Sequence, residues 1–125
     1  DQRLVIETVT YRLHGPRRGD IVVLKLPGQG DELLIKRVVG LPGERIEIRE
    51  GKVFIDGAPL DEPYLDQPTP GLLPSIVVPP LHVFVLGDNR SASNDSRSFG
   101  PVPRERIVGK AWATYWPPSE IGFVE

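Results

Sequence analysis

Fourteen prolines and thirteen glycines restrict the fold of this 125-residue chain more than any other feature of its sequence. They are scattered between short apolar runs rather than gathered in one linker. A proline inside a helix removes a hydrogen bond and costs about 3 kcal/mol, so long helices are not expected. Short strands joined by turns are compatible with this spacing. The sequence therefore predicts an all-β fold.

The segments between these breakers carry the pattern of strands. Residues 21–24 form a β-branched apolar run, typical of a strand that is covered on both faces. Residues 45–49 alternate polar and apolar side chains, and Glu50 and Gly51 link them to 52–56, which predicts a hairpin. The expected strands are 4–9, 21–24, 33–39, 45–49, 52–56, 81–86 and 107–116. They predict a single domain with a largely antiparallel folded sheet or small barrel.

Two long segments lack this pattern. Residues 57–80 contain seven prolines, and we expect an irregular, proline-rich insertion with little regular structure. Within it, the adjacent Asp61 and Glu62 indicate a charged turn rather than an acid–base pair. Residues 87–103 are polar and rich in serine, which predicts a second loop.

Charge and composition exclude several classes of protein. Fifteen Lys and Arg against seventeen Asp and Glu give a net charge of -2, which argues against a nucleic-acid binder that acts through a basic face. The absence of cysteine excludes a disulfide scaffold, a thiol nucleophile and a Cys-based zinc site. His14 and His82 are far apart and lack the spacing of metal ligands. We expect neither a metal nor an organic cofactor.

Lys36 is the first candidate for chemistry. Side chains alternate along a strand, so Lys36 shares a face with the apolar Leu34 and Val38. Burial disfavours the ammonium form and lowers the pKa of a lysine, and a neutral amine can accept a proton from a hydroxyl. The alternative is a lysine whose stem packs while its charged end reaches water.

The second candidate is the polar run 87–100. Its carboxylates and guanidinium groups, Asp88, Arg90, Asp95 and Arg97, can form ion pairs that make the loop rigid. A serine within this run could also orient a lysine by hydrogen bonding to it. The alternative is a solvated surface loop.

Three motifs in one order indicate a family. They are RGDIVV at 18–23, IKRVVGLPGE at 35–44 and GDNRSASNDSRSFG at 87–100, with further matches at 51–57, 61–64 and 107–111. The sequence resembles the extracytoplasmic catalytic region of type I signal peptidases, the membrane-anchored Ser/Lys endoproteases. The resemblance covers nearly the whole chain apart from the proline-rich stretch, and it implies a largely antiparallel β-structure.

The resemblance also implies roles for individual residues. Lys36 matches the catalytic lysine, the general base of the family. Ser93 matches the serine that hydrogen-bonds this lysine and holds its amine toward the nucleophile. Four further residues match positions that support the site through ion pairing: Asp88, Arg90, Asp95 and Arg97.

One motif of the family is absent. Its nucleophilic serine lies in a Ser-Met-x-Pro-Thr-Leu type motif, a few residues before the segment matched here by 4–9. None of the six serines of this chain has such a context; they are Ser75, Ser91, Ser93, Ser96, Ser98 and Ser119. The chain also lacks methionine and any run of about 20 apolar residues that could cross a membrane as a helix. We therefore expect a truncated catalytic region that lacks the nucleophile and the membrane anchor and is inactive as it stands.

The resemblance implies an enzyme of protein secretion. The substrate would be an exported preprotein whose small-x-small cleavage site lies extended along a strand edge. The parent protein would be anchored in the bacterial plasma membrane with its catalytic domain on the extracytoplasmic side. Trp112, Tyr115 and Trp116 suit a bilayer interface, although they are equally compatible with a core or an edge strand.

Two alternatives stay open. The first is a related Ser/Lys protease with another role, such as an organelle inner-membrane peptidase or a self-cleaving repressor, and the motif at 87–100 argues against the repressor. The second is a non-catalytic β-domain that binds extended peptides.

Overall fold

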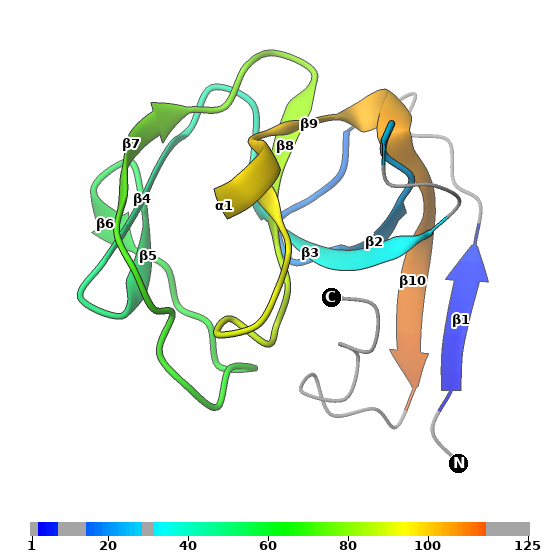
Figure 1. Ribbon diagram of the computed structural model, residues 1–125, viewed down its shortest axis with the longest axis horizontal. Helices are drawn as coiled ribbons and strands as arrows, with labels where there is room; N and C mark the ends of the chain where they lie inside the picture. Colours follow the sequence, from blue (N-terminus) through cyan, green and yellow to red (C-terminus); the bar gives the residue numbers. More distant parts are fainter. Residues whose placement is uncertain (1–2, 8–14, 29–31, 115–125) are drawn as a thin grey trace.

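The computed structural model of the protein describes residues 3–7, 15–28 and 32–114. Within these residues the backbone forms two antiparallel sheets (Figure 1). The six-stranded sheet has the order β1 (Arg3–Glu7), β10 (Ile107–Thr114), β2 (Ile21–Leu24), β3 (Leu34–Gly40), β8 (His82–Leu86) and β9 (Val102–Pro103). The four-stranded sheet has the order β6 (Ala58–Pro59), β5 (Lys52–Ile55), β4 (Arg45–Arg49) and β7 (Leu73–Val77). The prediction of a largely antiparallel all-β fold is confirmed.

Strands β3 and β8 are covered on both faces. Along β8, Val83 and Val85 belong to one apolar cluster while Phe84 and Leu86 belong to another. One cluster comprises Val22, Leu24, Leu34, Val38, Val83, Val85 and Val102, and the other comprises Val39, Ile46, Ile48, Val53, Val78, Phe84 and Leu86. Because successive side chains of a strand point to opposite faces, a continuous apolar run can serve two cores. These two strands therefore join the two halves of the fold (Figure 1).

Gly40 allows a close approach at the end of β3. A Cβ atom at this position would lie 2.6 Å from Cδ1 of Ile46 and 2.9 Å from Cβ of Phe84. The pairing of β3 with β8 also shifts register between Val38 and Gly40. A residue without a side chain is needed where the chain leaves the six-stranded sheet and packs against the second cluster.

The predicted hairpin is present as β4 and β5. Its register pairs Ile46 with Ile55 and Arg49 with Lys52. Both turn residues have positive φ, 53° at Glu50 and 77° at Gly51. Positive φ at both central residues is typical of the two-residue hairpin turn whose twist matches that of the flanking antiparallel strands.

Residues 57–80 contain more regular structure than the sequence indicates, although most of the stretch lies outside strands. This stretch contains β6 and β7, and β7 pairs with β4 so that Ile76 lies opposite Ile46. Pro74 is tolerated in β7 because the strand lies at the edge of its sheet, where one side of the backbone needs no partner.

Residues 87–103 also contain more structure than the sequence indicates. A four-residue helix, α1 (Ser96–Phe99), is capped by Asp95, whose side chain accepts a hydrogen bond from the backbone N–H of Arg97. The strand β9 and the 3-10 turn η1 (Arg104–Arg106) follow.

Candidate active site

Lys36 lies on β3 between the apolar neighbours predicted from the alternation. Its side chain is among the most buried of the described residues, at 1% exposure, and Leu34 and Val38 belong to the same apolar cluster. The alternative of a charged end in water therefore does not hold. The Nζ atom of Lys36 donates a hydrogen bond to Oγ of Ser93 at 3.1 Å.

Ser93 connects this amine to a buried carboxylate. The Ser93 hydroxyl also hydrogen-bonds to the side chain of Asp95, which is fully buried. Asp95 accepts a bond from the backbone N–H of Gly87 at 3.0 Å and two from the Arg97 guanidinium at 2.7 and 2.9 Å. Burial raises the pKa of Asp95, but the bonds from Arg97, Gly87 and Ser93 outweigh it, so the pKa lies below its usual range. The carboxylate is therefore ionised at neutral pH.

Asp88 fixes the start of the same loop to β3. Its carboxylate accepts two hydrogen bonds from the guanidinium of Arg37, at 2.8 and 2.9 Å. Arg37 follows Lys36 directly on β3, and it also donates to the carbonyl of Gly19. Its guanidinium lies 3.8 Å from the centre of the Tyr64 ring. This arrangement joins the loop, β3 and the proline-rich stretch.

Arg90 has partners that sequence reasoning did not identify. Its buried guanidinium binds both carboxylate oxygens of Glu62, at 2.7 and 3.1 Å, and the hydroxyl of Thr69 at 3.1 Å. Its Nε atom donates to the carbonyl of Gly87 at 2.7 Å. The family match at 61–64 was the available signal for Glu62, but the prediction of a charged turn describes only Asp61, which is exposed.

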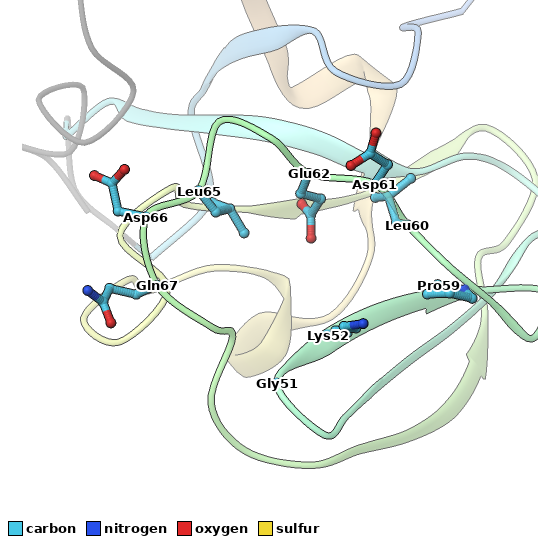
Figure 2. A pocket seen from close by; sticks show the side chains of 9 residues that line it. All are labelled: Gly51, Lys52, Pro59, Leu60, Asp61, Glu62, Leu65, Asp66 and Gln67. Atoms are coloured by element: carbon cyan, nitrogen blue, oxygen red, sulfur yellow. The ribbon is translucent and has the colours of Figure 1, made fainter.

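Glu62 also lines a hollow of about 450 Å³. Figure 2 shows the Glu62 side chain pointing into the space between the hairpin turn and the segment around Leu65, whereas Asp61 points away. The lining residues are Gly51, Lys52, Pro59, Leu60, Asp61, Glu62, Leu65, Asp66 and Gln67. The hollow thus reaches the carboxylate that binds Arg90.

The histidines and the C-terminal aromatic residues are the remaining candidates from the sequence. In the described part of the chain, no three His, Cys, Asp or Glu residues gather as metal ligands would. His82 hydrogen-bonds through Nδ1 to the carbonyl of Pro80, and His14 lies outside the described residues. Tyr115 and Trp116 also lie outside them, so the interface hypothesis for Trp112 and these two residues stays a prediction.

Comparison with known proteins decides the family. Residues 1–116 match the family described as signal peptidase, peptidase S26. The chain belongs to this signal peptidase family. The resemblance drawn from the motifs at 18–23, 35–44 and 87–100 is confirmed.

Individual signal peptidases are similar over nearly the whole chain. It is 44% identical to "Probable signal peptidase I-1" of Synechocystis sp., over 96% of this chain and 65% of that protein. It is 41% identical to signal peptidase I of Leptolyngbya laminosa, over 98% of this chain and 64% of that protein. It is 36% identical to thylakoidal processing peptidase 1 of Arabidopsis thaliana, over 95% of this chain and 38% of that protein. The chain thus spans less than two thirds of the length of these relatives.

A solved structure of the family has the same fold. The crystal structure of a signal peptidase I from Enterococcus faecalis matches with a TM-score of 0.67 and 33% sequence identity. The match covers 76% of this chain and 95% of the other. In the described residues of this signal peptidase chain, no helix is long and apolar enough to cross a bilayer.

Proposed function

We propose that this chain is the catalytic region of a serine endopeptidase that removes N-terminal signal peptides from exported preproteins, with Lys36 as the general base. The observation that carries the proposal is the buried amine of Lys36 at hydrogen-bond distance from Ser93. Family membership and the identity to signal peptidases support it.

The surroundings of Lys36 favour the form of the amine that a base requires. An ammonium group at 1% exposure loses most of its hydration, which favours the neutral amine. Because Nζ donates to Ser93, its lone pair points away from that hydroxyl and can accept a proton from another one. Asp95 accepts from Ser93 in turn, so two connected hydrogen bonds restrict the orientation of the amine.

The reaction follows from this base. The nucleophilic serine transfers its proton to Lys36 and its oxygen attacks the scissile carbonyl, which gives a tetrahedral intermediate. The Lys36 ammonium returns the proton to the leaving amine of the mature protein, and an acyl-enzyme remains. Lys36 then takes a proton from water, and the resulting hydroxide attacks the ester carbonyl. The serine–acyl bond breaks, the Lys36 ammonium returns its proton to the serine oxygen, and the signal peptide is released with a new carboxylate.

The nucleophile is proposed to come from a segment outside these 125 residues. No serine of this sequence stands in the nucleophile motif of the family, and the relatives are longer than the chain. We propose that the 125-residue chain alone is inactive. We also propose that the parent enzyme acts at the extracytoplasmic face of a bacterial plasma membrane, on small-x-small cleavage sites. The relatives at 44% and 41% identity come from Synechocystis and Leptolyngbya, which supports a bacterial origin for the parent enzyme.

Cleavage of a preprotein tests the proposal. The 125-residue chain and a longer form that includes the preceding residues would be incubated with a preprotein that carries an Ala-x-Ala site. We expect cleavage by the longer form alone, and loss of cleavage in Lys36→Ala. Lys52→Ala is the matched control, because Lys52 is exposed at the start of β5. Cleavage that survives Lys36→Ala would contradict the proposed role of Lys36.

A further inference from the structure

Glu62 and Arg90 form a buried ion pair between two segments that are far apart in the sequence. Their side chains are 6% and 1% exposed, and two hydrogen bonds join them across 28 positions. Glu62 comes from the proline-rich stretch, whereas Arg90 lies in the loop that holds Ser93. A buried pair of this kind gives little net stability, because desolvation of both charges offsets their attraction. Its value lies in fixing one arrangement of the two segments.

A chain of hydrogen bonds leads from Arg90 to Lys36. The carbonyl oxygen of Arg90 accepts a bond from the Arg97 guanidinium at 2.7 Å. The same guanidinium holds Asp95, and Asp95 binds the hydroxyl of Ser93. Ser93 accepts from the Lys36 amine. Displacement of Arg90 would therefore loosen the groups that direct the amine.

Glu62 also reaches β3 by a second route. It accepts a hydrogen bond from the hydroxyl of Tyr64 at 2.7 Å. The ring of Tyr64 lies under the Arg37 guanidinium, next to Lys36 on the same strand. Burial raises the pKa of Tyr64, and the bond to Glu62 adds to this, so the phenol stays protonated and remains a donor. Glu62 thus accepts three hydrogen bonds from two side chains, Arg90 and Tyr64.

We propose that Glu62 is a positioning residue of this protease, which anchors Arg90 and Tyr64 and so keeps Ser93 against Lys36. The inference rests on the proposed function, because it needs Lys36 as the base. Thr69 assists from the same stretch: its hydroxyl accepts from Arg90, and its backbone N–H binds the carbonyl of Gly51 in the hairpin turn. The proline-rich stretch thus holds the loop of Ser93 in place through the bonds of Glu62 and Thr69 to Arg90.

The ion pair of Arg18 and Glu44 provides a matched control. It is also a two-bond Arg–Glu pair, at 2.6 and 2.7 Å, but its side chains are 33% and 18% exposed and contact neither Ser93 nor Arg90 in the bonds described. Glu62→Gln and Glu44→Gln would be made in the longer, active form of the enzyme. The kinetic constants for preprotein cleavage would be measured between pH 5 and pH 10.

We expect Glu62→Gln to lower kcat about tenfold with KM changed less than twofold, since the base is misdirected while substrate contacts are intact. The acid limb of the kcat/KM profile should also move to higher pH, because a looser loop admits water to the Lys36 amine and favours its protonated form. Glu44→Gln should change neither quantity. Equal profiles and equal kcat for the two variants would overturn the inference.

Two further variants cover the remaining outcomes. Should Glu62→Gln fail to fold, Thr69→Val removes one acceptor of Arg90 with little change of shape, and we expect about a threefold lower kcat with the same direction of pH shift. Unchanged kcat in Thr69→Val would then overturn the inference. Lys36→Ala separates the two proposals: activity in that variant defeats the proposed function, whereas an inactive Lys36→Ala beside an unaffected Glu62→Gln defeats only the role of Glu62.

Discussion

The Nζ atom of Lys36 and the Oγ atom of Ser93 lie 3.1 Å apart although 57 positions separate them in the sequence. Strand pairing explains the contact. Arg37 lies opposite Leu86 in the antiparallel register of β3 and β8, so the loop that leaves β8 starts beside Lys36. The Asp88–Arg37 and Asp95–Gly87 bonds then fold this loop back onto β3.

Ser93→Ala should lower kcat by about 10- to 100-fold in the longer, active form, because the amine loses the group that directs it and general-base catalysis contributes about 10²–10⁴-fold. Ser91→Ala is the matched control in the same loop, since Ser91 is exposed. Preprotein cleavage under single-turnover conditions measures the effect. Equal rates for the two variants would rule out an orienting role for Ser93.

Lys36→Met should abolish cleavage and yet raise the free energy of unfolding at pH 7 by about 1–2 kcal/mol. The amine lies at 1% exposure between apolar neighbours, and a thioether of similar length removes the cost of burying it. Urea unfolding followed by circular dichroism measures the change. Lys52→Met, at the exposed first residue of β5, should stay within about 0.5 kcal/mol of the wild type. A destabilised Lys36→Met would show that the amine contributes to the core rather than being tolerated in it.

Asp95 should make the stability of the fold depend on acid pH. The pKa of Asp95 is lowered in the folded state, so its contribution is complete above the ordinary aspartate value of about 4 and is lost as the pH falls through the lower, folded value. Asp95→Asn should cost about 2–4 kcal/mol at pH 7, where it leaves Arg97 without its carboxylate, and should show a shallower loss of stability between pH 5 and pH 2.

Urea unfolding at a series of pH values measures both effects of Asp95→Asn. Asp66→Asn serves as the control, because Asp66 is an exposed aspartate of the same fold. The same acid dependence in the wild type and in Asp95→Asn would contradict the assignment.

Gly40→Ala should destabilise the fold by about 1–3 kcal/mol. The added methyl group would lie 2.9 Å from the Cβ atom of Phe84, which cannot move without its backbone, and 2.6 Å from the end of Ile46. Gly15→Ala is the control, since its methyl group would meet only the flexible end of Arg104, at 3.3 Å. Thermal unfolding of the two variants measures the difference. A melting temperature of Gly40→Ala equal to that of Gly15→Ala would show that β3 can move to accept the methyl group.

Some features were predictable because they depend on neighbours in the sequence. The alternation of Leu34, Lys36 and Val38 indicates the burial of the lysine, since the two-residue period of a strand fixes which side chains share a face. Glu50 and Gly51 indicate the hairpin for the same local reason. The strand β7 was missed because its proline content argues against a strand, and only its place at a sheet edge makes Pro74 acceptable.

The sequence by itself determined the β class, the hairpin and the family. Turn residues, side-chain alternation and ordered motifs each depend on residues that are close together in the sequence. The tertiary structure alone decided that Glu62 is the partner of Arg90. The local sequence around Asp61 and Glu62 does not indicate which guanidinium Glu62 binds in the folded protein. That contact forms only when the packing of the two sheets brings distant segments together and removes water from both charges. Each buried charge is then stabilised by the other, because neither can be solvated by water.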